Sequence, residues 1–206
     1  LSLLLWAALI GSATGLVRYV GITWLITGSI LILLNADLYW KTKIKHVFLF
    51  GLIGCSLPFL NLFRNYWVSE TVAGVRQTSL KSFSANIEDF VNVLDYWFPI
   101  SNEENQVFLK ICCIFFLLVI ISLLGFRLLQ QQYYKSPITV ISLFSLVYGG
   151  FMLFMATVSR FETLSSRLMI PLYIPVIVLI AYCFYYWIVK SRQYKKWMVL
   201  TLFLGV

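Results

Sequence analysis

The sequence predicts an all-α protein: a polytopic bundle of transmembrane helices with one external loop that carries an amphipathic surface helix. Hydrophobic residues make up 61% and charged residues 12% of the 206 residues, whereas soluble domains have about 25% charged residues. Apolar runs near the roughly 20 residues that cross a bilayer as a helix also recur along the chain. Because backbone polar groups in lipid must be satisfied within their own segment, these runs are expected to be helical.

Five apolar runs are long enough for full spans, and two shorter runs are expected to be truncated spans. The full spans are Tyr19 to Asn35, Val47 to Phe63, Phe108 to Phe126, Ile138 to Val158 and Leu168 to Val189. The truncated spans are Leu1 to Ser12 and Trp197 to Val206. Because both ends of the sequence fall in apolar runs, we expect residues 1–206 to be one transmembrane region, an internal or C-terminal piece of a longer protein.

The longest connection, Arg64 to Asn105, contains a predicted amphipathic helix. Its apolar residues recur at helical spacing: Phe83, Ile87, Phe90, Val91, Leu94 and Phe98. Ser82 or Ser84 is expected to cap this helix, and Pro99 to end it. We expect the helix to lie on the membrane surface with Tyr96 and Trp97 at the level of the lipid headgroups.

The distribution of basic residues predicts the orientation of the spans. One set of connections has nine Lys or Arg against one acid: Lys41, Lys43, Lys45, Arg127, Lys135, Lys190, Arg192, Lys195 and Lys196 against Asp37. The opposite set has seven basic and seven acidic residues. By the positive-inside rule, the connections Lys41 to His46 and Lys190 to Lys196 are cytoplasmic in a multi-pass protein of the plasma (inner) membrane. The net charge of +8 therefore indicates topology, and we expect no nucleic-acid partner.

Soluble-enzyme motifs, such as a P-loop, a dinucleotide fingerprint or a nucleophile elbow, are absent from the sequence. The four cysteines lie in apolar runs, and His46 has no second ligand at a suitable spacing. The sequence thus predicts no disulfide framework, metal site or cofactor, with a divalent cation left open. The acids of the long connection are interpreted as the solvated side of its helix, since no pair has the spacing of an acid and base.

Arginines stand out on the predicted external side. Arg18, Arg64, Arg160 and Arg167 each lie where an apolar run meets that face. Guanidinium groups bind phosphate in a bidentate manner, so a cluster would suit a lipid-linked phosphate. The alternative is that each arginine extends to the lipid headgroups as a simple anchor, and Glu162 neutralises one of them. Near Arg167, Pro171 is expected in a first helical turn and Pro175 to bend the helix.

Three segments resemble the polyprenyl-phosphate-dependent GT-C glycosyltransferases, the group that contains family 39, the protein O-mannosyltransferases, and the aminoarabinose transferases. They are TGLVRYVGITWLITGSILILL (14–34), LFRNYWVSETVAGVRQTSLKSFSANIEDFVNVLDYWFP (62–99) and SSRLMIPLYIP (165–175). The resemblance implies an enzyme that transfers a sugar from a lipid-phosphate donor to an acceptor at the outer face. The family's catalytic carboxylate lies in a first external loop that has no counterpart here, so no catalytic residue is assigned.

The resemblance suggests that Arg18 lies near the donor phosphate and that Arg64, Arg76 and Arg167 line the same cavity. Arg160, from the external set, and Tyr19, which stands where many relatives have glycine or proline, complete the predicted substrate-binding residues. The expected partners are a lipid-linked sugar donor, membrane lipids and an acceptor that the sequence does not identify. The alternative functions are a transporter or flippase of an anionic or lipid-linked substrate, or a membrane assembly subunit without a site.

Overall fold

The regular elements that the computed structural model describes are all helices. It describes residues 2–17, 19–71, 79, 81–97, 136–159 and 164–190. The elements are α1 (Ser2–Val17), the 3-10 helix η1 (Tyr19–Gly21), α2 (Ile22–Leu34), α3 (Trp40–Ser69), α4 (Phe83–Trp97), α6 (Pro137–Val158) and α7 (Ser166–Lys190). The predicted all-α class is confirmed for this part of the chain, whereas the predicted spans Phe108 to Phe126 and Trp197 to Val206 lie outside it.

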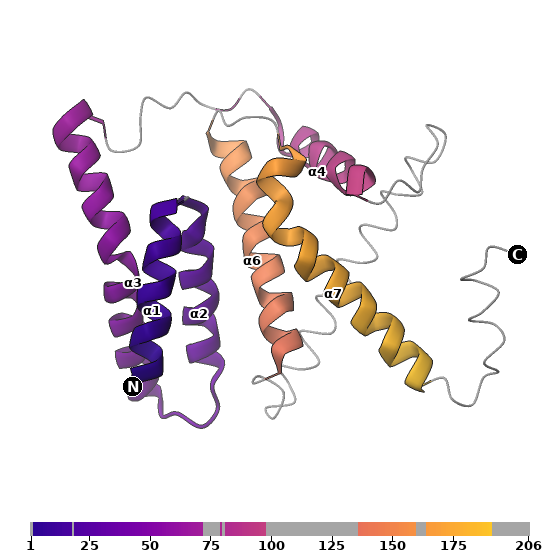
Figure 1. Ribbon diagram of the computed structural model, residues 1–206, viewed down its shortest axis with the longest axis horizontal. Helices are drawn as coiled ribbons and strands as arrows, with labels where there is room; N and C mark the ends of the chain where they lie inside the picture. Colours follow the sequence, from indigo (N-terminus) through magenta and orange to yellow (C-terminus); the bar gives the residue numbers. More distant parts are fainter. Residues whose placement is uncertain are drawn as a thin grey trace, which may run out of the picture.

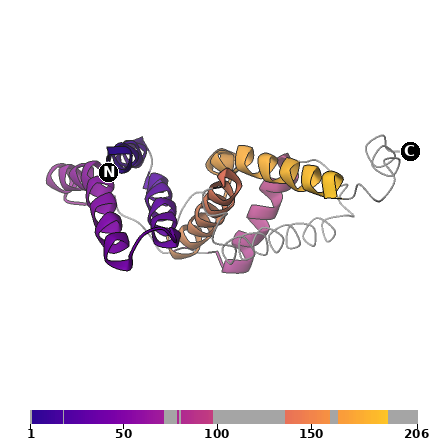
Figure 2. The same cartoon turned by 90° about the horizontal axis from the view of Figure 1, so that it is seen from below.

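The long helices stand side by side in an extended row (Figures 1 and 2). At one end of the row α1, α2 and α3 contact one another, and at the other end α6 contacts α7. α2 joins the two groups because it contacts both α3 and α6. The indole of Trp24 in α2 stacks on the ring of Phe144 in α6, with centroids 4.6 Å apart. α4 lies across the upper ends of α6 and α7 in Figure 1 and contacts both.

Three of the described helical segments are long and apolar enough to cross a membrane: Trp40–Ser69, Pro137–Val158 and Ser166–Tyr185. α2 has 13 residues, or about 20 Å of helix, which is shorter than the roughly 30 Å hydrocarbon core of a bilayer. The predicted full span Tyr19 to Asn35 is therefore not confirmed as a span, and neither is the total of five. α1 continues beyond Ser12, the predicted end of the first truncated span, to Val17.

Small residues allow α1 to pack closely against its neighbours. Gly11 and Gly15 have the G-x-x-x-G spacing that brings membrane helices together. A Cβ atom at Gly15 would lie 2.6 Å from Cγ of Pro58 in α3, and one at Gly21 would lie 2.5 Å from the backbone carbonyl of Thr14. Because Gly21 has no side chain, η1 can turn back closely against the end of α1.

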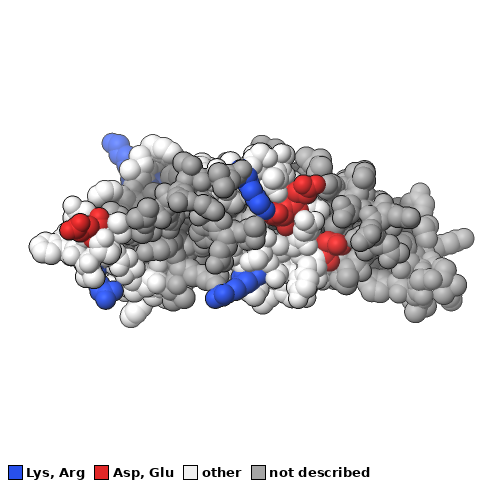
Figure 3. All heavy atoms as spheres, turned by 90° about the horizontal axis from the view of Figure 1, so that it is seen from above, with Lys and Arg blue, Asp and Glu red and all other residues white. Residues whose placement is uncertain are grey.

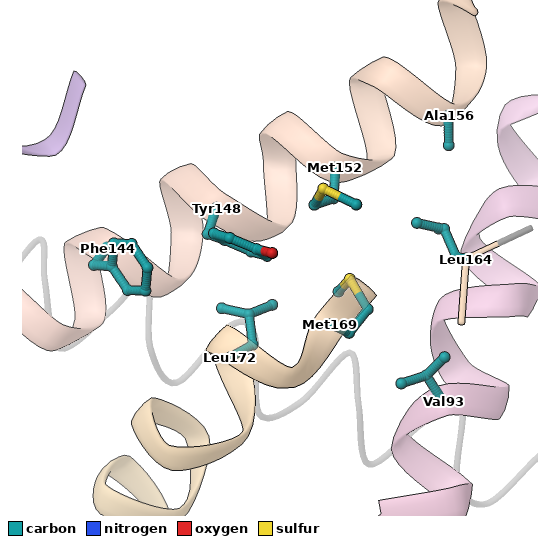
Figure 4. Close-up of a cluster of buried hydrophobic side chains, with 8 residues drawn as sticks. All are labelled: Val93, Phe144, Tyr148, Met152, Ala156, Leu164, Met169 and Leu172. Carbon is teal, nitrogen blue, oxygen red and sulfur yellow. The ribbon is translucent and has the colours of Figure 1, made fainter. Parts of the chain in front are cut away.

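The larger hydrophobic core forms where α4, α6 and α7 meet (Figure 4). Its buried side chains are Val93, Phe144, Tyr148, Met152, Ala156, Leu164, Met169 and Leu172. Figure 4 shows Tyr148 and Met152 of α6 facing Leu172 and Met169 of α7, with Val93 entering from α4. α4 is therefore part of the bundle's own packing.

The amphipathic helix predicted in the long connection is confirmed as α4. The amide of Ala85 donates to Oγ of Ser82 over 3.3 Å, which makes Ser82 the cap, and the helix ends at Trp97, shortly before Pro99. Within the predicted apolar series, Phe90 packs against the core and Val91 is buried, whereas Phe83 and Ile87 are exposed. The indole of Trp97 packs edge-on against Tyr173 of α7, with centroids 5.3 Å apart, so one side of α4 is covered by protein.

Several helices extend beyond the apolar runs that predicted them. α3 continues past Arg64 to Ser69, so the long connection starts later than expected. α7 begins at Ser166, ahead of the predicted Leu168. Pro171 consequently lies in the second turn of α7, where the absence of its N–H deprives the carbonyl of Arg167 of an intrahelical donor. Pro171 is predicted in the first turn of the helix, where a missing N–H has little effect on stability. This prediction is wrong because α7 starts at Ser166.

Candidate functional site

The structure describes two of the predicted substrate-binding side chains. These are Arg64 in α3 and Arg167 in α7. Tyr19 is the first residue of η1, and its side chain is outside the described part. Arg18, Arg76 and Arg160 also lie outside the described residues, so their predicted roles stay predictions.

Arg167 lies at the head of an exposed apolar stripe on α7. Ile170, Ile174 and Ile177 follow it at intervals of three and four residues, which places all four side chains on one face of the helix. Arg167 itself is exposed, and the isoleucines are 60%, 69% and 38% exposed. From Arg167 to Ile177 the stripe is about 15 Å long. It offers a phosphate-binding cation at the helix end and hydrocarbon contact directly below it.

The opposite face of α7 fixes the direction of this stripe. Met169 and Leu172 are 1% and 3% exposed and belong to the core shared with α6. The hydroxyl of Tyr148 in α6 donates to the carbonyl of Leu168 over 2.7 Å. This bond ties the first turn of α7 to α6 next to Arg167, whose guanidinium is thereby directed away from the core.

Arg64 lies on the last turns of α3 among exposed aromatic side chains. Phe63 and Trp67 on the same helix have ring centroids 6.0 Å apart, and both are exposed. In Figures 1 and 2 this end of α3 and the start of α7 are apart, on opposite sides of α2 and α6. The structure therefore does not bring Arg64 and Arg167 together.

The ends of the helices that carry or flank the predicted arginines nevertheless share one side of the molecule. The end of α1 with η1, the end of α3 and the start of α7 all lie at the top in Figure 1. Figure 3 views this side, and the Lys and Arg side chains described on it are dispersed along the face. Within the described residues, the basic side chains on this side are therefore separate from one another.

Asn86 is a buried polar residue that has no role among the sequence predictions. It is 2% exposed, and its Nδ2 donates to Oγ1 of Thr157 in α6 over 3.3 Å. With Phe90, Val93 and Trp97 it forms the i, i+4, i+7, i+11 series that packs on α6 and α7. Of these four residues, only Phe90 belongs to the apolar series predicted from the sequence.

The acidic residues of α4 are engaged within the protein. Asp89 accepts from the ammonium group of Lys81 over 2.6 Å, and Glu88 and Asp95 also have interaction partners. Among the described residues, no group of three or more His, Cys, Asp or Glu gathers in a way that could hold a metal ion. Among the described residues, the candidate site thus consists of basic side chains and exposed apolar side chains. Comparison of the chain with protein families, with curated proteins and with solved structures finds no match.

Proposed function

We propose that the chain is part of an integral membrane glycosyltransferase that takes a sugar from a polyprenyl-phosphate donor at the extracytoplasmic face. One observation carries the proposal: Arg167 stands at the head of the exposed stripe Ile170, Ile174 and Ile177. A guanidinium holds a phosphate through paired hydrogen bonds, and an isoprenoid chain gains from apolar contact along a helix face. The resemblance of the segments 14–34, 62–99 and 165–175 to GT-C enzymes supplies the reaction.

In this reaction the arginines stabilise the departing lipid phosphate, and an acid outside the described residues deprotonates the acceptor. Arg64 lies apart from Arg167 and is proposed to bind the headgroup of a second lipid. Arg18, Tyr19, Arg76 and Arg160 keep their proposed place near the donor. α4 supports the site indirectly, because it packs on α6 and α7 beside the turn that carries Arg167.

The test measures sugar transfer by the intact protein in proteoliposomes that contain a radiolabelled polyprenyl-phosphate sugar. Arg167→Ala is expected to lower transfer roughly 10- to 100-fold, the usual effect of losing a hydrogen bond to a charged group. Arg167→Lys should retain part of the activity, since it keeps the charge but loses the paired geometry. Lys45→Ala, an exposed cation in the first half of α3, is the control and should leave transfer unchanged.

Two outcomes separate this function from ordinary anchoring. If Arg167→Ala retains full transfer with normal expression, the residue contacts only bulk lipid headgroups. Replacing Ile174 by Asn should weaken donors with long isoprenoid chains more than short-chain analogues. Equal effects on both donors would contradict the proposed path of the chain along the stripe.

A transporter or flippase is the second candidate function, favoured by prolines inside two of the spans. Pro58 interrupts α3, and Pro171 and Pro175 interrupt α7, whereas the sequence prediction placed an interruption in the last full span alone. Broken helices line the substrate sites of many transporters. In the same proteoliposomes, a flippase would move the lipid-linked sugar across the bilayer without forming a glycosylated product.

A further inference from the structure

A side chain of α1 accepts a hydrogen bond from the backbone of α3. The amide N–H of Leu57 donates to Oγ of Ser12 over 3.1 Å, although Leu57 lies in the middle of a 30-residue helix. The adjacent hydroxyl of Ser56 donates to the carbonyl of Ile53 over 2.6 Å. In an unbroken helix the amide of Leu57 uses this same carbonyl. Ser12 thus accepts a hydrogen bond from a backbone amide of α3, and Ser56 donates one to a backbone carbonyl of the same helix.

Pro58 follows Leu57 directly in α3. It has no N–H to offer the carbonyl of Gly54, and its ring crowds the preceding turn, so a helix bends at such a residue. Figures 1 and 2 both show α3 bending partway along its length. Gly15 of α1 lies against the ring of Pro58, where a Cβ atom would come 2.6 Å from its Cγ. α1 therefore contacts α3 through Ser12 and Gly15 at the point where α3 bends.

The two halves of α3 differ in burial on either side of Pro58. In the first half Phe50 and Gly54 are buried against α1 and α2. In the second half, which we name the arm (Phe59–Ser69), large side chains project on several sides of the helix. The exposed ones are Phe59, Leu60, Phe63, Tyr66, Trp67 and Val68. The first half is thus fixed by packing, and the arm is held chiefly through its junction.

We infer that α3 is hinged at residues Ile53 to Pro58, and that the hydrogen bond from the Leu57 amide to Ser12 holds the arm at the angle seen here. The arm carries Arg64, so the position of this arginine follows the hinge angle. Trp67 lies about 14 Å from Pro58 along the axis, and a change of about 20° moves it by roughly 5 Å. The hinge does not rest on the proposed function, since it follows from the contacts between α1 and α3.

The test measures distances between spin labels in the intact protein in lipid nanodiscs, with the native cysteines replaced by alanine. One label at Val68 reports the arm, and its partner at Phe154 lies on an exposed position of α6. A second pair, Phe48 with Phe154, reports the first half of α3. Pro58→Ala restores the missing N–H and is expected to shift the distance from Val68 by about 5 Å or more. Ser12→Ala should broaden that distance distribution.

Matched controls keep the test specific. Ser2→Ala removes an exposed hydroxyl at the start of α1, and Pro175→Ala removes a proline from another helix, so neither should change the distance from Val68. The distance from Phe48 should stay the same in every variant. The inference is overturned if Ser12→Ala and Pro58→Ala both reproduce the wild-type distribution. It is also overturned if Pro58→Ala shifts the Phe48 pair equally, because the change is then a rearrangement of the whole bundle.

Discussion

Tyr148 of α6 and Leu168 of α7 are joined by a hydrogen bond from the phenol hydroxyl to the backbone carbonyl, 2.7 Å long. Tyr148 is 3% exposed and belongs to the core, and its bond to Leu168 is partly buried beside the turn that carries Arg167. Two helices that are connected through residues near Arg160 are thereby fixed at their shared end. The exposed stripe of α7 owes its direction to this contact and to the apolar packing of Met169 and Leu172.

Replacing Tyr148 by Phe is expected to destabilise the protein by about 1 kcal/mol, because it removes one partly buried hydrogen bond and little volume. Thermal unfolding in detergent measures the change. Tyr185→Phe is the control, since Tyr185 is 65% exposed, and it should stay within about 0.5 kcal/mol of the wild type. A Tyr148→Phe protein as stable as the control would mean that the bond contributes nothing in the membrane.

Replacing Asn86 by Ala is expected to loosen α4 from α6, because the hydroxyl of Thr157 loses its cross-helix donor. The bond lies next to well-packed apolar contacts, so the expected cost is about 1 kcal/mol, as for other hydrogen bonds between membrane helices. Hydrogen exchange of the α4 amides measures the effect and should become faster. Asn92→Ala, at an exposed position of the same helix, should leave exchange unchanged. Equal exchange in the two variants would show that apolar contacts alone hold α4.

Replacing Gly21 by Ala is expected to destabilise the turn between α1 and α2. The added Cβ would lie 2.5 Å from the carbonyl carbon and oxygen of Thr14, and backbone atoms cannot give way as a flexible side chain does. A cost of about 1 to 3 kcal/mol is expected, as for other overpacked positions. Thermal unfolding in detergent detects it.

Gly51→Ala is the matched control for Gly21→Ala. Nothing lies within 4 Å of a Cβ atom at Gly51, which is inside α3. Alanine has the higher helix propensity by about 1 kcal/mol, so this variant should be neutral or more stable. If both variants melt at the same temperature, the close approach of Gly21 to α1 is not what restricts this turn.

The all-helical architecture could be predicted from composition because backbone groups in lipid have few other ways to be satisfied. Three helices that are long and apolar enough to cross a membrane follow from the lengths of their apolar runs. The 13-residue α2 could not be predicted in the same way, since its run continues through η1 into Asn35 with little change in hydrophobicity. The length of an apolar run does not show where a turn divides it. The turn at Gly21 depends on the close approach of Gly21 to the backbone of Thr14, which the sequence does not reveal.

The packing face of α4 shows a second limit of the sequence. Phe90 and Val91 of the predicted apolar series are covered in the structure, but so are Asn86 and Val93, which lie outside that series. A prediction based on hydrophobic positions alone misses a packing face that includes a polar residue such as Asn86. Asn86 is tolerated in the interior because Thr157 provides its partner, and that pairing is visible only after α4 and α6 are placed together.

The orientation of α3 in the membrane gives a further test of the predicted topology. Tyr39 and Trp40 are exposed at its start, and Tyr66 and Trp67 are exposed near its end. Trp40 and Trp67 are about 40 Å apart along a helix, close to the distance between the two headgroup regions of a bilayer. Aromatic side chains favour these regions. The start also carries Lys41, Lys43 and Lys45, which predicts that it faces the cytoplasm.

Cysteines placed singly at Tyr39 and Val68, in a protein whose native cysteines are replaced, check this orientation. We expect a membrane-impermeant maleimide to label the cysteine at 68 in intact cells and the cysteine at 39 only after the membrane is opened. Both positions are highly exposed, at 86% and 77%, so burial in the protein would not prevent labelling. Labelling of both from the same side would mean that α3 does not cross the membrane. Labelling in the reverse order would mean that the lysines at its start are external, and would move Arg64 to the cytoplasmic side.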